Sequence, residues 1–75
     1  MFRFDDLEPE LREAVKNYRH YGHQAATYDH LVAKYDRDED YVKLREALDR
    51  RAYWQGKITG LIKGREKELF WVLIG

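Results

Sequence analysis

The sequence contains no cysteine and no serine, and its single proline is Pro9. Without cysteine, disulfide bonds and thiolate metal sites are excluded, and without serine there is no serine nucleophile. Long apolar runs are missing too, since the longest, residues 69–74, is far shorter than the roughly 20 residues of a membrane-spanning helix. No basic segment followed by an apolar core opens the chain. We therefore expect no signal peptide and a soluble, cytoplasmic protein.

Neither sign of charge prevails over the whole chain, but its two halves differ. Residues 1–40 contain six basic and ten acidic side chains, whereas residues 41–75 contain eight basic and four acidic ones. Oppositely charged halves favour a chain that folds back on itself or pairs with a second copy. The formal net charge of zero argues against a general nucleic-acid binder, whose affinity depends on neutralising phosphates.

Apolar side chains recur at heptad spacing along the chain. In the first half the two sets of positions are Phe4, Leu11, Tyr18, Ala25 and Val32, and Leu7, Ala14, Tyr21, Tyr28 and Tyr35. With Asp6 as a fair N-cap and Pro9 in the first turn, this pattern predicts a helix over residues 7–35. An acidic turn follows at residues 36–40, and a second, interrupted heptad predicts a helix over residues 39–73.

Two helices joined by a short turn predict an all-α antiparallel hairpin, as a single domain over residues 1–75. A hairpin this small leaves apolar surface uncovered, so we expect a homodimer that forms a four-helix bundle. An α+β fold is the alternative, with a β-hairpin at residues 57–74. Residues 69–74 are rich in strand formers, and glycine weakens helices.

Three glycines recur at every fourth position of the second predicted helix: Gly56, Gly60 and Gly64. Each glycine in a helix interior costs about 1 kcal/mol relative to alanine. We expect them to be compensated by close packing, with bulky side chains of the first helix opposite the gaps on the second.

Aromatic side chains are the main candidates for a binding surface, because tyrosine and tryptophan are over-represented at interface hot spots. The expected dimer or partner interface consists of Tyr18, Tyr21, Tyr28, Tyr35, Trp54, Phe70 and Trp71. Packing between the two helices is the competing interpretation of the tyrosines.

Basic residues form a stripe on the second helix: Lys43, Arg50, Arg51 and Lys57. Beside aromatic rings, such a stripe is typical of contacts to a nucleic-acid backbone. Glu46 and Asp49 interleave with it, which favours an ordinary salt-bridged face.

Metal binding is not expected at either candidate cluster. His20, His23 and His30 fall on the outer heptad positions, which favours a solvated face. The acids of residues 36–40 resemble the start of a calcium loop, but Tyr41 replaces the required glycine and Ala47 the bidentate glutamate. No phosphate-binding loop or convergent catalytic pair is present, so we expect neither a cofactor nor an enzyme.

Two heptad helices with a short turn resemble the Rop class of plasmid regulators, whose hairpins dimerise into four-helix bundles and bind RNA. By its size, lack of catalytic residues and aromatic-rich surface, the chain is also similar to small phage-encoded proteins that block host machinery, such as anti-CRISPR and anti-activator proteins. The second resemblance implies an inhibitor or adaptor that occludes a functional site on a bacterial protein. The first implies RNA or DNA binding through the basic stripe of the second helix.

Overall fold

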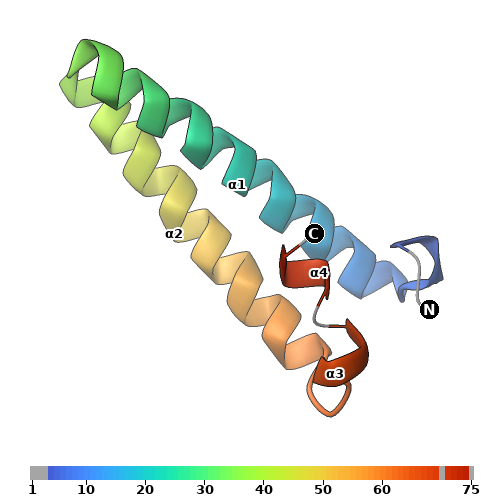
Figure 1. Ribbon diagram of the computed structural model, residues 1–75. Coiled ribbons are helices and arrows are strands. Elements are labelled where there is room, and N and C mark those ends of the chain that lie inside the picture. Colours follow the sequence, from blue (N-terminus) through green and yellow to red (C-terminus); the bar gives the residue numbers. More distant parts are fainter. Residues whose placement is uncertain (1–3, 70, 75) are drawn as a thin grey trace.

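The protein is a helical hairpin with a folded-back tail in the computed structural model, which describes residues 4–69 and 71–74 (Figure 1). Its elements are a 3-10 turn η1 (Phe4–Asp6) and the helices α1 (Pro9–Tyr35), α2 (Asp38–Leu61), α3 (Glu66–Leu69) and α4 (Trp71–Ile74). The long helices α1 and α2 pack antiparallel. The described residues contain no strand, so the predicted all-α hairpin is confirmed and the alternative β-hairpin at residues 57–74 is wrong.

The first helix starts slightly later than predicted and ends where predicted. Pro9 is its first residue, with Glu8 and not Asp6 at the N-cap. Proline suits this position because its missing N–H would have no partner within the helix. The helix ends at Tyr35, because Asp36 adopts a left-handed conformation (φ 52°, ψ 46°) and its N–H bonds back to the Val32 carbonyl at 3.0 Å.

The second helix ends at Leu61, well before the predicted end at residue 73. Gly64 lies in the turn that follows and has a φ of +89°, a conformation that favours glycine. Two hydrogen bonds close this turn. The N–H of Arg65 donates to the Ile62 carbonyl at 2.7 Å, and the N–H of Gly64 donates to the Glu66 carboxylate at 2.9 Å. The chain therefore reverses direction, and the tail, residues 66–69 and 71–74, returns to the hairpin.

Within the hairpin, the predicted close packing at Gly56, Gly60 and Gly64 does not occur. Gly56 and Gly60 are exposed, and a Cβ added to either would meet no atom within 4 Å. The face of α2 that meets α1 contains Ala47, Trp54 and Ile58 instead, and the glycines lie outside that face. Gly64 is needed for its backbone conformation in the turn.

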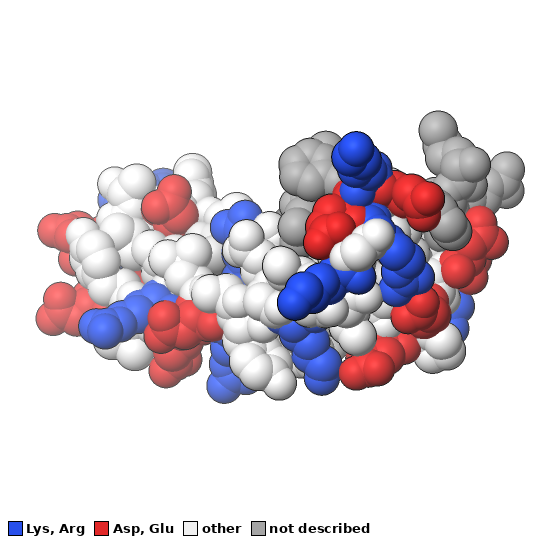
Figure 2. Space-filling model, turned by 90° about the horizontal axis from the view of Figure 1, so that it is seen from below, with Lys and Arg blue, Asp and Glu red and all other residues white. Residues whose placement is uncertain are grey.

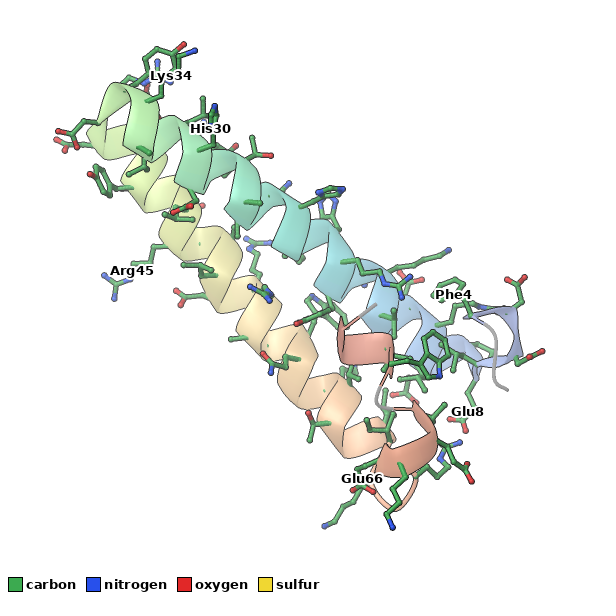
Figure 3. All side chains as sticks on the ribbon, in the orientation of Figure 1. Phe4, Glu8, His30, Lys34, Arg45 and Glu66 are labelled. Atoms are coloured by element: carbon green, nitrogen blue, oxygen red, sulfur yellow. The ribbon has the colours of Figure 1, made fainter. Side chains whose placement is uncertain are left out.

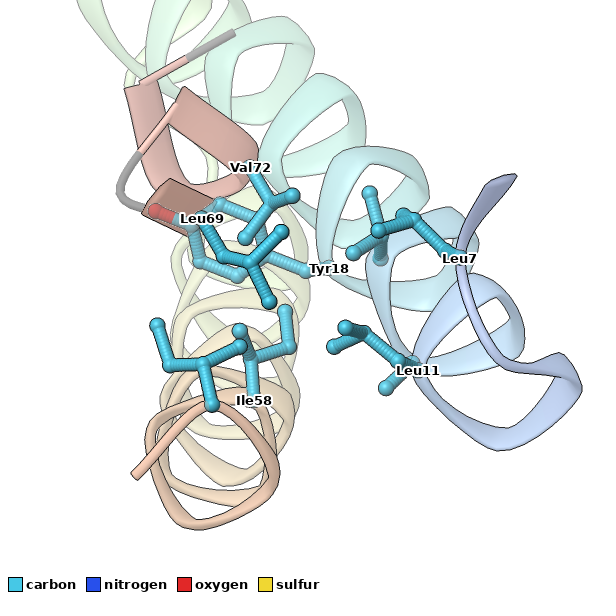
Figure 4. Packing of buried hydrophobic residues seen from close by; sticks show 9 residues of the cluster. Leu7, Leu11, Tyr18, Ile58, Leu69 and Val72 are labelled. Atoms are coloured by element: carbon cyan, nitrogen blue, oxygen red, sulfur yellow. The ribbon is translucent and has the colours of Figure 1, made fainter. Parts of the chain in front are cut away.

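The hydrophobic core lies at the open end of the hairpin, where the tail adds a third layer (Figure 4). Its buried members come from all three parts of the fold: Leu7, Leu11, Ala14, Val15, Tyr18, Ile58, Ile62, Leu69 and Val72. Leu69 and Val72 are each only 1% exposed. The tail therefore covers much of the apolar surface that a bare hairpin would leave in water.

Toward the turn, the hairpin has two layers only, because the tail ends part way along it (Figure 1). The molecule measures 42 × 19 × 19 Å, and its radius of gyration is 14.3 Å. A compact domain of this length would have a radius of gyration of about 11 Å. The protein is thus a rod with a closed core at one end and a thin, exposed half at the other.

Candidate functional site

Tyrosine side chains of α1 contact basic side chains of α2. The Arg51 guanidinium lies 5.3 Å from the centroid of the Tyr18 ring, and that of Arg50 lies 5.7 Å from the Tyr21 ring. Each arginine also donates a hydrogen bond of 3.3 Å to the hydroxyl of the same tyrosine. Residues that the sequence suggested as two separate sites therefore form an interhelical cation–π ladder.

One further pair extends this ladder toward the turn, where the Lys43 ammonium of α2 lies 5.8 Å from the Tyr28 ring of α1. Lys57 pairs within α2 instead, with its ammonium 5.3 Å from the Trp54 ring. The hydrogen bond to Tyr21 raises the pKa of Arg50 above its ordinary value, because the charged donor is the form that makes it. All four basic candidates for nucleic-acid contact thus have an aromatic partner in their own chain.

The residues of the predicted aromatic interface differ in burial and lie in different parts of the fold. Tyr18 belongs to the buried core, and Trp54 and Trp71 pack against that core. Tyr21 and Tyr28 are half-buried beside α2, whereas Tyr35 is exposed at the end of α1. Phe70 lies outside the described residues. The described members of this set therefore do not form one continuous surface.

A polar hollow of about 300 Å³ opens beside the ladder. It is lined by His20, Tyr21, Gln24, Tyr28, Lys43, Glu46, Ala47 and Arg50. The ring nitrogen of His20 lies 3.2 Å from the Gln24 amide, so one imidazole atom already has a hydrogen-bonding partner. Because Glu46 shares the hollow with the cations, it is not a uniformly basic site.

A second groove, of about 250 Å³, is built from different faces of α1 and α2 and is more apolar. It is lined by Gly22, Ala25, Ala26, Asp29, Leu44, Leu48 and Arg51. The small side chains of α1 form a shallow floor, and Leu44 and Leu48 of α2 form one wall. Arg51 lies at one end of this groove, level with Gly22, since a Cβ added to Gly22 would be 3.7 Å from its Nε atom. Sequence reasoning missed the groove, although Gly22 and Ala26 are one helical turn apart.

The tip of the hairpin presents three large exposed side chains, Tyr35, Tyr41 and Val42. The Tyr41 hydroxyl donates a hydrogen bond of 2.6 Å to the Asp36 carboxylate, which fixes the ring across the turn. This bond and the nearby negative charge raise the pKa of Tyr41, because ionisation would remove the donor beside a carboxylate. We call the surface formed by Tyr35, Tyr41 and Val42 the apolar tip.

Two acids of the turn, Asp36 and Asp40, have structural roles. Asp40 is 3% exposed, and its carboxylate accepts a hydrogen bond of 2.8 Å from Arg37, which anchors the start of α2. Asp36 ends α1 and receives the Tyr41 hydroxyl. The burial of Asp40 was not predicted, although the residue lies at a heptad position that faces α1.

The remaining histidine candidates are on the surface. His23 and His30 are exposed on α1, and Figure 3 shows His30 projecting away from the hairpin. In the described part of the chain, no group of three His, Asp or Glu side chains is close enough to hold a metal ion. None of the described helices combines the length and apolar character that a membrane crossing requires.

No protein-family model matches this chain, and neither a curated protein nor a solved structure matches it significantly.

Proposed function

We propose that the protein is a non-enzymatic binding module whose apolar tip docks on another protein and covers a functional site there. The exposure of Tyr35, Tyr41 and Val42 at one end of a thin rod carries this proposal, because Val42 is 57% exposed and the two tyrosines are about half exposed. Clustered exposed tyrosines beside an aliphatic side chain are typical of interface hot spots.

The tip is also pre-organised. The hydrogen bond from Tyr41 to Asp36 holds one ring, and the guanidinium of Arg37 lies 4.9 Å from the centroid of the Tyr35 ring. A ring that is already fixed loses less conformational entropy when a partner binds, so more of its contact energy appears as affinity.

The chemistry of the partner follows from the charges around the tip. Asp36, Asp38 and Glu39 are exposed beside it, and the cations of Lys34 and Arg37 lie over the Tyr35 ring. A complementary partner surface has an apolar patch with both acidic and basic side chains around it. In the form implied by the resemblance to phage- and plasmid-type inhibitors, the partner is a bacterial protein, and binding blocks its site without chemistry.

The test compares a tip variant with a matched surface variant. Tyr35→Ser combined with Val42→Ser removes the apolar tip and keeps the bond between Tyr41 and Asp36. Tyr53→Ser is the control, because Tyr53 is 62% exposed on α2 but distant from the turn. A bacterial protein captured from lysate, then purified, should bind the wild type and the control but not the tip variant. Equal binding by all three, or capture of no protein, contradicts the proposal.

Binding of RNA or DNA through Lys43, Arg50, Arg51 and Lys57 receives less support. Each of these cations lies over an aromatic ring of the same chain. Figure 2 shows basic and acidic side chains interspersed over the visible face, without a continuous basic surface. Nucleic-acid affinity would fall steeply from low to physiological salt, whereas binding at the apolar tip should respond weakly.

A further inference from the structure

The groove of about 250 Å³ lies between α1 and α2, on the turn side of the place where the tail packs against the same two helices. At the open end, Leu69 and Val72 pack in the core with Val15 of α1 and Ile58 of α2. Seven residues nearer the turn on each helix, the corresponding positions are Gly22 and Arg51, which line the uncovered groove. Figure 1 shows that α4 ends part way along the hairpin.

The uncovered part has a shape that admits a helix. Gly22, Ala25 and Ala26 keep the surface of α1 low, so that another backbone can approach closely. Leu48 stands beside this floor and is 44% exposed, although it belongs to the apolar heptad of α2. The heptad pattern thus places the apolar side chain of Leu48 on this face, where it remains partly exposed to water in the monomer.

The amount of exposed surface fits one missing partner. The chain exposes 5650 Å². A folded monomer of its mass typically exposes about 4,900 Å². The excess of roughly 750 Å² is close to the ~800 Å² that each partner buries in a standard protein interface.

The charges at the two ends of the groove identify the partner. Arg51 lies at one end, where its guanidinium covers the Tyr18 ring and forms no ion pair with a carboxylate of the described residues. Asp29 lies toward the turn, and its exposed carboxylate has no ion pair within the described chain. When two copies meet groove to groove in opposite directions, the Arg51 end of each faces the Asp29 end of the other.

We infer that the partner in this groove is a second copy of the same chain. The two copies form a two-fold dimer through the turn-proximal halves of their hairpins. Such an interface is self-complementary, since one surface supplies both partners of each contact. With the copies in opposite directions, α1 faces α1 and α2 faces α2 across the two-fold axis, so the two Leu48 side chains lie next to each other near the centre of the interface. A net charge of zero adds no long-range repulsion between the copies. This inference does not depend on the proposed function of the tip.

A first experiment measures mass by sedimentation equilibrium over a range of concentrations. The wild type should have twice the chain mass of 9.1 kDa. Leu48→Glu should be monomeric, because it places a charge in the middle of the interface. Val42→Glu is the matched control on the same helix outside the groove, and it should remain dimeric. A wild type that stays monomeric at millimolar concentration overturns the inference, as does a dimer that Leu48→Glu does not weaken.

A second experiment tests the predicted charge pairs by exchanging them. Asp29→Lys alone brings like charges together in its homodimer, and so does Arg51→Glu alone, so each should dimerise about tenfold more weakly or worse. An equimolar mixture restores both pairs and should form a heterodimer. Circular dichroism checks that both variants keep their helix content. If the mixture associates no better than either variant, the two-fold arrangement is wrong.

Failure of the dimer inference can be distinguished from failure of the proposed function. The tip variant Tyr35→Ser with Val42→Ser should still dimerise, because neither residue lines the groove. If no partner is captured but the dimer is intact, only the proposed function of the tip is contradicted. If a partner is captured but no dimer forms, only the inference about the groove is contradicted.

Discussion

Arg51 of α2 crosses to Tyr18 of α1, where its guanidinium covers the ring face and donates a hydrogen bond of 3.3 Å to the hydroxyl oxygen. Tyr18 is a buried core residue at the point where the third layer of the molecule ends. This contact therefore links the closed end of the rod to its two-layered half.

Tyr18→Phe should separate the two components of this contact. The variant keeps the ring under the guanidinium and removes the hydrogen-bond acceptor, so it should lower the free energy of unfolding by about 0.5–1.5 kcal/mol. Tyr18→Ala also removes the buried ring and should cost about 3–5 kcal/mol. Urea unfolding followed by circular dichroism measures both. Equal losses for the two variants would mean that the ring contributes nothing beyond the hydroxyl.

Alanine substitutions should sort the three glycines of the α2 region into two classes. Gly56→Ala and Gly60→Ala should each raise the free energy of unfolding by about 0.5–1 kcal/mol, because they favour the helix and meet no neighbour. Gly64→Ala should destabilise by about 1 kcal/mol or more, because alanine is strained at a φ of +89°. Thermal unfolding of the three variants tests this. A loss of stability for Gly60→Ala would indicate a close contact at the outer face of α2.

The tail should contribute strongly to the stability of the hairpin. Leu69→Ala removes a side chain that is 1% exposed and should cost about 2–5 kcal/mol. Lys67→Ala, two residues earlier and exposed, is the control and should change stability by less than about 0.5 kcal/mol. Unfolding is measured at low micromolar concentration, where self-association contributes least. Similar midpoints for both variants would show that the tail does not pack on its own hairpin.

The turn after α2 should weaken in acid. The Glu66 carboxylate accepts backbone hydrogen bonds from its own N–H and from that of Gly64, which lowers its pKa below the ordinary value. A lowered pKa in the folded state gives stability that is present at neutral pH and is lost as the pH falls below the ordinary glutamate range. In Glu66→Gln this part of the acid sensitivity should disappear. Titration of the Glu66 carboxyl by NMR checks the direction, and an unshifted pKa contradicts it.

The fold was accessible from sequence because local signals agree with it. Heptad spacing up to Tyr35, Pro9 at the start and the polar turn all favour a hairpin. The end of α2 was not accessible, because the apolar pattern continues through Leu69 and Val72 after the helix has stopped. Apolar periodicity indicates which side chains are buried, but not whether the helix continues between them. Here the chain reverses direction after α2, and the apolar residues of the tail pack in the same core.

The candidate surfaces were harder to predict, because they depend on which residues face each other across the two helices. Tyr18 and Arg51 were each recognised as notable, but their contact requires the register of α1 against α2. The same applies to Asp29 and Arg51 at the ends of the groove, which lie on different helices. Sequence spacing alone gives the faces of each helix and not the level at which they meet.

The folded-back tail also sets the order in which the protein matures during translation. The hairpin precedes residues 66–74 in the chain, so Leu11 and Ile58 leave the ribosome before the residues that shield them. Until Leu69 and Val72 follow, the open end stays hydrated and the helices are held mainly by their contacts with each other. The hydrophobic interior is consequently completed only after both long helices have been synthesised.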